Sequence, residues 1–357
     1  MPVDLSYIKS AQVKRAYIHD FINKTLVIEL KKPMSVVSTL EGYRENIERV
    51  GNHYFPVQTW GLGHSEGLIG LRKRTYAVLG LDEKNTSCLF TGADMDNLSV
   101  KTKSFKDMTV AALVTAGVRG NALKMSKDNG GYYEPGTINI LIMSNMQLSH
   151  RAMTRAIISA TEAKSAALAD MDIRSSYSSL KHQATGTGTD NILVVEGEGT
   201  LINNAGGHSK MGELIAKAVY DGVKDAVFKQ NGIIGKRTVY HRLKERKINV
   251  SGLGNITGCD CNIEKSELNA EIEKILLNPY YSGFLESAFA ISDAHEKGVI
   301  GNIDFFKEQS DRIAKEISGN PELVIHNLVT QDDMPVILKT ALNSIINGAV
   351  GRLELIN

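Results

Sequence analysis

Cysteine is scarce in this sequence of 357 residues, which has three in all, at positions 88, 259 and 261. So few, and an odd number, cannot supply the disulfide framework of a small secreted domain and are typical of a reducing compartment. Cys259 and Cys261 could bind a soft metal, but a zinc site needs four ligands at a recognisable spacing, and Cys88 is remote. We therefore expect a cytoplasmic protein with no metal site.

A surplus of charge is also missing. The chain carries 41 Lys and Arg against 40 Asp and Glu, a formal net charge of +1, whereas binding to nucleic-acid phosphates requires a basic excess. The N-terminus lacks the apolar core of a signal peptide, and no stretch reaches the roughly 18 apolar residues of a membrane-spanning helix. We expect a soluble protein that neither binds nucleic acid nor inserts into a membrane.

Short apolar runs separated by glycines fill the chain up to about residue 228. Two Ala-rich amphipathic patterns, at about 149–171 and 209–229, predict long helices. Two consecutive strand patterns before a helix argue against strict βαβ alternation, so we predict an α+β fold with a layered mixed sheet. The predicted strands are 25–30, closed by Lys31, Lys32 and Pro33, and 34–39, 109–117, 137–145 and 191–197.

The composition changes from about Asn231 onward, where glycine and alanine become rarer and helical patterns recur. We predict two domains, residues 1–230 and a smaller, mostly helical extension at 231–357. The predicted helices of the extension are 265–277, 282–295, 303–317 and 334–346.

The densest polar motif is "ATGTGTDNI", Ala184 to Ile192. Its glycines give flexible backbone amides, and its hydroxyls and carboxylate are enough to grip a polar ligand. The alternative is a plain turn in which the carboxylate bonds to its own backbone. The candidate residues here are Gly186, Thr187, Gly188, Thr189 and Asp190.

A second motif, "NNAGGHSKMGELI", leads from Gly207 and His208 into a helix that Ser209 can cap. A helix N-terminus favours an anionic group, and His208 could act as a general base near neutral pH. The alternative is a surface histidine beside an ordinary glycine-rich cap.

Three further side chains could contribute. Asn121 and Asn139 lie at predicted strand ends, where their amides could orient a substrate carbonyl or simply tie loops together. Lys164 projects from the apolar stripe of the first long helix, so its charge needs a partner or a path to solvent.

The order of the motifs resembles the adenosylcobinamide amidohydrolase family, CbiZ, over about residues 33–228. The segments that carry the resemblance are "TGADMDNLSV", which contains Asp94, "VTAGVRGNAL", "PGTINI", "ATEAKSAAL", "ATGTGTD" and "GGHSKMGELI". The chain departs from the family pattern at Glu41-Gly42-Tyr43, where a glycine pair is expected. The segment after residue 228 has no counterpart in the minimal family domain.

The resemblance implies hydrolysis of the amide that joins aminopropanol to a corrinoid propionate, which converts adenosylcobinamide to adenosylcobyric acid in corrinoid salvage. Cobalt would belong to the substrate, so no protein-bound cofactor is expected. Alternatives are a corrinoid carrier without activity, or hydrolysis of complete cobamides or another amide. The extension could be a dimerisation element, which would make the protein a homo-oligomer, a lid or a second ligand module.

On this basis amide hydrolysis needs a base, an oxyanion site and groups that position the substrate. His208 or Asp190 would be the base, Thr187 and Thr189 would surround the oxyanion, and Lys164 would stabilise negative charge. A threonine nucleophile at Thr187 or Thr189 is a variant of this scheme. The expected substrate-binding residues are Asn121, Asn139, Gly186, Gly188, Gly207, Ser209 and Asp94.

Overall fold

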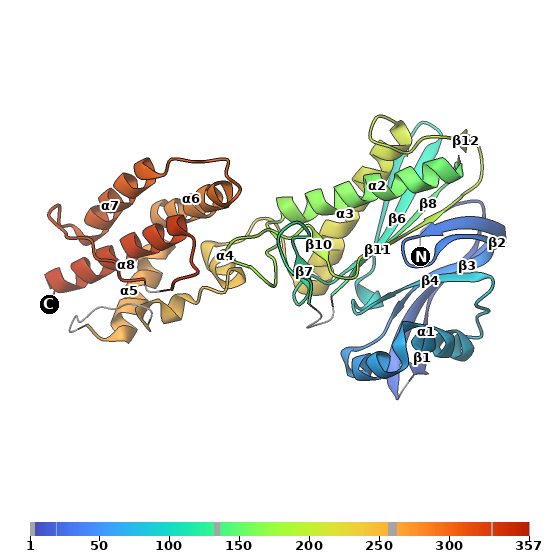
Figure 1. The fold of residues 1–357 in the computed structure, drawn as a ribbon, viewed down its shortest axis with the longest axis horizontal. Coiled ribbons are helices and arrows are strands. Elements are labelled where there is room, and N and C mark those ends of the chain that lie inside the picture. The colour runs from blue at the N-terminus through green and yellow to red at the C-terminus, as the bar shows by residue number, and fades with distance from the viewer. Residues whose placement is uncertain (1–3, 19, 132–135, 256–262, 330, 357) are drawn as a thin grey trace. The chain divides into compact units, whose positions relative to one another are not determined.

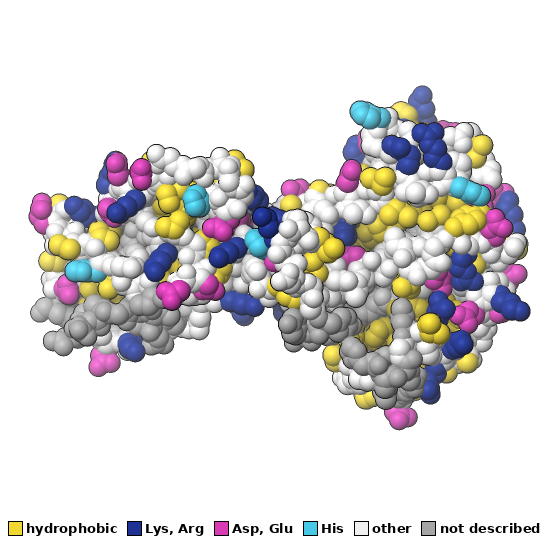
Figure 2. Space-filling model, in the orientation of Figure 1, with side chains coloured by type: hydrophobic (Ala, Val, Ile, Leu, Met, Phe, Trp, Pro, Cys, Tyr) yellow, Lys and Arg dark blue, Asp and Glu magenta, His cyan; other side chains and the backbone are white. Residues whose placement is uncertain are grey.

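The computed structural model describes residues 4–18, 20–131, 136–255, 263–329 and 331–356. The chain divides into two compact units. The N-terminal unit comprises Met1–Tyr177 and Gln183–Gly235, and the C-terminal unit comprises Ser178–His182 and Lys236–Asn357. No helix in the described ranges is long and apolar enough to cross a membrane. On the face drawn in Figure 2, basic and acidic side chains are intermixed.

The N-terminal unit is built on a mixed sheet of eight strands in the order β4-β3-β2-β11-β8-β6-β5, with β1 paired to β2. The pairs β3–β4 and β8–β11 are parallel, and the others are antiparallel. This arrangement confirms the predicted α+β class. The strands are β1 (Ile8–Ile18), β2 (Phe21–Ser38), β3 (Gly42–Tyr54), β4 (Thr86–Thr91), β5 (Ser99–Phe105), β6 (Met108–Ala116), β8 (Ile138–Ser144) and β11 (Asn191–Val195).

One prediction about the strands is wrong. The two runs at 25–30 and 34–39 belong to a single strand, β2, which continues through Pro33. Proline has no N–H to give to a sheet ladder, so it is tolerated in a strand only where no ladder bond is needed. Pro33 lies in the interval between Glu29 and Met34 where the pairing of β2 with β3 shifts register.

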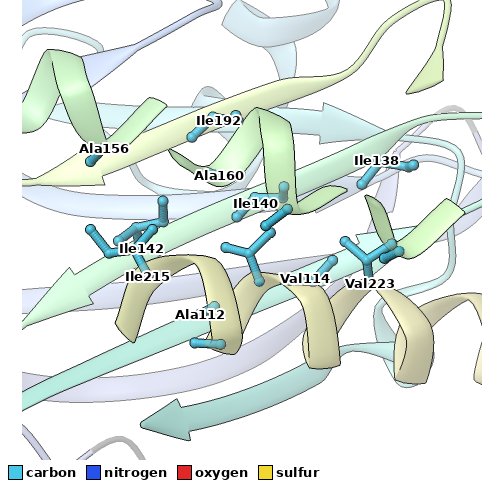
Figure 3. Close-up of a cluster of buried hydrophobic side chains, with 14 of the residues drawn as sticks. Ala112, Val114, Ile138, Ile140, Ile142, Ala156, Ala160, Ile192, Ile215 and Val223 are labelled. Atoms are coloured by element: carbon cyan, nitrogen blue, oxygen red, sulfur yellow. The ribbon is translucent and has the colours of Figure 1, made fainter. Parts of the chain in front are cut away.

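Two helices, α2 (His150–Asp170) and α3 (Lys210–Asn231), cover one face of the sheet. Their small side chains, such as Ala156 and Ala160, pack on the isoleucines of β8 (Figure 3). The predicted cap at Ser209 is confirmed, because its hydroxyl accepts from the Gly212 N–H. At the start of α2, the Ser149 hydroxyl accepts in the same way from the Ala152 N–H.

The other face of the sheet is also buried. Residues of β8 that point away from the helices, such as Leu141, share a core with Leu26 and Ile28 in the first half of β2 and with Leu89 in β4. Helix α1 (Trp60–Leu79) packs outside β4, where Tyr76 contacts Cys88 and Phe90. The single sheet therefore folds over on itself. Helices α2 and α3 cover one face of the half that contains β8, the half that contains β3 and β4 packs on its other face, and α1 lies outside β4. Figure 1 shows β3, β4 and α1 on the side of β8 away from α2.

Short elements complete the N-terminal unit. Strands β7 (Ala122–Leu123) and β10 (Gly186–Thr187) pair with each other, as do β9 (Gln147–Leu148) and β12 (Leu201–Ile202). The 3-10 turns η1 (Val57–Thr59) and η2 (Met95–Asn97) follow β3 and β4. Figure 1 shows β7 and β10 at one end of α2 and β12 at the other.

The C-terminal unit has its own apolar core, to which Leu180 also belongs. The predicted helical character is confirmed, and the last predicted helix extends ten residues further, to Ile356. Its helical elements are α4 (Val239–Glu245), η3 (Val250–Asn255), α5 (Lys265–Leu277), α6 (Pro279–Glu296), α7 (Asp304–Ser318) and α8 (Val336–Ile356).

Candidate active site

The polar motif at Ala184–Ile192 runs from β10 to the start of β11. Strand β10 is held by β7, in the register Thr187 to Ala122. Strand β11 begins beside β8, with Asn191 opposite Asn139. Because the two strands are parallel neighbours, the residues just before them meet at one edge of the sheet. Asp190 therefore lies next to the start of β8. We call this end of the two central strands, formed by Ile138, Thr187 and Asp190, the Asp190 edge.

The Asp190 carboxylate is the centre of this edge. One oxygen, Oδ1, accepts from the Ile138 N–H at 2.9 Å and the Thr187 hydroxyl at 2.5 Å. The other, Oδ2, accepts from the Thr187 N–H at 3.0 Å and from the Lys164 ammonium. Four donors occupy the roughly four lone-pair positions of an ionised carboxylate. Asp190 thus stabilises its own turn, as the simpler interpretation predicts, and also joins β8, β10 and α2.

Lys164 has the charged partner that its position on the apolar stripe of α2 requires. Its side chain is 10% exposed and its ammonium pairs with Asp190, which is 14% exposed. Within the described ranges, Asp190 is its one acceptor, so two of the three ammonium N–H groups are unused. Gly186 makes the approach possible, because a Cβ there would be 2.5 Å from Asp190 Oδ2 and 2.6 Å from Lys164 Nζ.

Thr189 and Thr137 form a second pair of hydroxyls, separate from the Thr187–Asp190 pair. The Thr189 hydroxyl donates to the Gly136 carbonyl at 3.1 Å and hydrogen-bonds to the Thr137 hydroxyl. Since Thr189 has one proton and gives it to Gly136, Thr137 must be the donor between the two threonines. The pair therefore presents lone pairs rather than protons, and it is poorly suited to stabilise an oxyanion.

Asn121 is near the same loop, but its amide is already engaged. It donates to the Gly136 carbonyl at 3.0 Å and accepts from the Tyr177 hydroxyl at 3.1 Å. A Cβ at Gly188 would be 3.0 Å from its oxygen, and the Gly188 N–H donates to its carbonyl. Asn121 therefore ties the loops together, which is the alternative role that the sequence allows.

Asn139 is buried between the two sheet layers, one residue inside β8. Its amide donates to the Asn52 side chain at 2.8 Å and to the Phe90 carbonyl at 2.9 Å. Asn52 in turn donates to the Thr115 hydroxyl. These contacts join β3, β4, β6 and β8 beneath the Asp190 edge.

Four predicted residues lie elsewhere. His208 and Gly207 are exposed, and Ser209 is engaged as a helix cap. Their neighbour Gly206 packs on the Arg155 side chain. Arg155 precedes Lys164 by nine residues in α2, which corresponds to about 13 Å along the helix axis.

The fourth, Asp94, caps η2 and pairs with Lys24 at 2.7 Å. The structure does not bring these four residues together with Asp190.

A cavity of about 440 Å³ opens at the Asp190 edge. Part of its lining is polar and includes Thr137, Thr189 and Asp190. The apolar part, called here the apolar wall, includes two aromatic rings that contact each other, Phe55 and Trp60. The lining residues are Leu40, Phe55, Trp60, Phe90, Thr91, Gly92, Thr137, Gly188, Thr189, Asp190 and Asn191.

The sequence profile of the adenosylcobinamide amidohydrolase family, CbiZ, matches residues 4–235. The chain belongs to this family. As a CbiZ protein it is an amide hydrolase of corrinoid salvage. The match contains the whole Asp190 edge and ends at the residue where the N-terminal unit ends.

Two curated relatives each match more than half of this chain. An uncharacterized protein of Methanocaldococcus jannaschii is 40% identical over 59% of this chain and 88% of its own length. An adenosylcobinamide amidohydrolase of Methanosarcina mazei is 31% identical over 57% of this chain and 93% of its own length.

Two solved structures show a weak likeness to this chain. A protein of Pyrococcus horikoshii and an L-aminopeptidase D-Ala-esterase/amidase of Ochrobactrum anthropi each align with a TM-score of 0.33. They are 11% and 10% identical, cover 62% and 63% of this chain, and are each covered over 85% of their length.

The sequence did not predict the apolar wall of the cavity. Phe55 and Trp60 follow β3 without periodicity, and Phe90 lies in a uniformly buried strand. His53 lies beneath them, with ring centroids 6.1 Å from Phe55 and 5.5 Å from Phe90. Burial lowers the pKa of His53 to about 3, so it is a neutral packing residue and no base at pH 7.

Two other sequence features do not form the sites that their residue types suggest. Gly63 to Gly67 spells Gly-x-Ser-x-Gly, but the nucleophile elbow requires a turn between a strand and a helix, and this segment lies inside α1. Cys88 is buried, and burial raises the pKa of its thiol, so it is not a reactive thiolate. Cys259 and Cys261 lie outside the described residues. In the described ranges no cluster of His, Cys, Asp and Glu could hold a metal ion.

Proposed function

We propose that the Asp190 edge is the catalytic centre at which this CbiZ protein cleaves adenosylcobinamide to adenosylcobyric acid and aminopropanol. The observation that carries the proposal is the hydrogen-bonded series Thr187, Asp190 and Lys164, whose carboxylate lines the cavity. A hydroxyl on a carboxylate that a third group holds in place is the signature of an activated nucleophile.

Thr187 is the nucleophile in this proposal, and its proton distinguishes it from Thr189. The Thr187 hydroxyl donates to a carboxylate, whereas the Thr189 hydroxyl donates to a backbone carbonyl that is not basic. Thr187 Oγ1 attacks the amide carbon while Asp190 Oδ1 takes its proton. The lone-pair-bearing Thr137 and Thr189 hydroxyls suit the substrate amide N–H.

Lys164 stabilises the oxyanion that forms in this step. Its ammonium is held beside Thr187 by Asp190 and has two N–H groups to spare. Collapse of the tetrahedral intermediate breaks the C–N bond, and the protonated Asp190 gives its proton to the aminopropanol nitrogen. Water, activated by Asp190, then hydrolyses the ester between Thr187 and adenosylcobyric acid.

Three variants test the nucleophile. Thr187→Val should lower kcat by about a thousandfold or more, because activated nucleophiles and their bases act as a unit. Thr187→Ser should retain activity, and Thr189→Val should raise KM more than it lowers kcat. Free aminopropanol and adenosylcobyric acid are measured by mass spectrometry without ATP.

A covalent readout identifies the step itself. Acid-quenched wild-type protein should carry an adenosylcobyric acid ester on the peptide that contains Thr187, and Thr187→Val should carry none. Near-normal turnover by Thr187→Val and by Asp190→Asn would overturn the catalytic assignment. Binding of adenosylcobinamide without any turnover in the wild type would favour a carrier.

A further inference from the structure

The apolar wall of the cavity comes from elements outside the motifs that carry the chemistry. Leu40 follows β2, Phe55 and Trp60 follow β3, and Phe90 lies in β4. Leu40, Phe55 and Trp60 are half-buried, whereas Phe90 is 6% exposed. Phe90 therefore forms the inner part of the wall, and the other three lie toward solvent, at its mouth.

The size of the cavity limits what can enter it. Pockets of roughly 300–1,000 Å³ enclose drug-sized ligands, and this one has about 440 Å³. A corrinoid with its adenosyl group is several times larger than a drug-sized molecule. The short amide arm can reach Asp190, while the macrocycle stays at the mouth.

The mouth offers a surface that matches a macrocycle. The Phe55 and Trp60 rings have centroids 5.5 Å apart and are tilted by 42°. Phe55 packs in turn on the neutral His53 ring, whose Nδ1 is hydrogen-bonded to the Thr25 hydroxyl at 2.7 Å. Flat aromatic rings held by a packed support bind flat ligands at a low cost in side-chain entropy.

We infer that Trp60 and Phe55 stack against the corrin macrocycle and select corrinoid amides over other amides. This inference rests on the proposed function, because the arm must reach Asp190 for the macrocycle to meet these rings. The arm leaves the corrin on the face opposite the adenosyl group. With the arm inside the cavity, that lower face is turned toward Trp60 and the adenosyl group is turned away.

Trp60 also provides the measurement, because it is the single tryptophan of the chain. The full-length Asp190→Asn protein, which should bind without turnover, is titrated with adenosylcobinamide while the quenching of Trp60 fluorescence is followed. Equilibrium dialysis, read by the visible absorbance of the corrinoid, gives the dissociation constant of variants that lack the tryptophan.

Three variants define the expected result. Trp60→Leu, which keeps apolar bulk without a flat ring, should weaken binding about tenfold. Trp60→Phe should restore most of the affinity. Tyr17→Ala, which removes an aromatic ring that is 72% exposed on β1, should bind like the parent. Circular dichroism checks that each variant is folded.

The second ligand separates the macrocycle from the adenosyl group. Dicyanocobinamide lacks adenosine, so Trp60→Leu should weaken its binding by the same factor. Equal affinity of Trp60→Leu and Trp60→Phe for both ligands would overturn the inference, and so would a loss confined to the adenosyl form.

The kinetics separate this inference from the catalytic assignment. In the wild-type background, Trp60→Leu should raise KM about tenfold and leave kcat nearly unchanged. If it does so while Thr187→Val stays active, the binding inference stands and the nucleophile is wrong. If Thr187→Val is inactive and Trp60→Leu has a normal KM, the catalytic assignment stands and the binding inference is wrong.

Discussion

Lys164 and Asp190 form an ion pair in which both side chains are largely removed from water, at 10% and 14% exposed. Lys164→Met keeps the apolar stem but leaves the carboxylate without its counter-charge, so the free energy of unfolding should fall by about 3 kcal/mol. The double variant Lys164→Met/Asp190→Asn removes both charges and should recover part of that loss. Urea denaturation measures both, and a single variant as stable as the wild type would contradict the pairing.

His53 makes stability depend on pH in a defined direction. Its pKa is about 3 in the folded chain because burial disfavours the imidazolium, against about 6.5 when unfolded. The unfolded state therefore binds the proton first, so this contribution is complete above about pH 6.5 and is lost as the pH falls toward 3.

Between pH 7.5 and 5.5 the wild type should lose about 1.4 kcal/mol more than His53→Gln, which cannot titrate. Urea midpoints at the two pH values measure the difference between the proteins, which removes the contribution of the other titrating groups. Identical pH dependence in both proteins would mean that His53 takes up a proton equally in the folded and the unfolded chain, which would contradict its lowered pKa.

At the scale of single residues, the sequence predicts what local chemistry dictates. The Gly-Thr-Asp turn and the need of Lys164 for a partner are visible because an unpaired buried charge is costly wherever it lies. The sequence cannot reveal that Asp190 is the partner of Lys164, since 26 residues separate the two. For the same reason the helix cap at Ser209 is correct, while the distance of His208 from Asp190 depends on how two helices pack.

Helix α3 approaches the sheet closely at Gly222. A Cβ there would be 2.8 Å from the Val114 side chain in β6, whereas a Cβ at Gly283 in α6 meets no atom within 4 Å. Alanine is favoured over glycine in a helix by about 1 kcal/mol, but overpacking costs about 1–3 kcal/mol. Gly222→Ala should therefore lower the Tm, and Gly283→Ala should raise it.

Thermal unfolding of the full chain, followed by circular dichroism, distinguishes the two substitutions by sign. Stabilisation by both would show that α3 can move away from β6. That result would contradict the close packing of α3 on the sheet.

The elements that the sequence predicts share one property, a continuous apolar run or a clear apolar stripe. Strand β8 is buried at every position, α2 has an Ala-rich inner face, and α3 has an apolar one. Strand β1 is polar, and Ile18 is its one buried residue. Within the described residues it pairs with β2 alone, so it carries no such signal. Helix α1 is interrupted by glycines, and Gly67 has a non-helical backbone within it.

At the scale of the whole molecule, the family match and the N-terminal unit end at the same residue, Gly235. The match covers 4–235, and the C-terminal unit resumes at Lys236 with an apolar core of its own. The composition change near Asn231 predicts a boundary because a helical unit has a different glycine content from a layered sheet. The crossing segment Ser178–His182 could not be predicted, since five residues carry no periodicity.

Because the Asp190 edge, the cavity and the family match all lie before residue 236, the N-terminal unit should act alone. Residues 1–235 with Leu180→Ser, which replaces a side chain that packs in the C-terminal core, should fold and hydrolyse adenosylcobinamide with a kcat close to that of the full chain. Aminopropanol release measures kcat, and size-exclusion chromatography reports whether the truncated protein has the same assembly state. A folded but inactive truncation would mean that the C-terminal unit takes part in turnover, whereas full activity with a lower assembly state would assign it to oligomerisation.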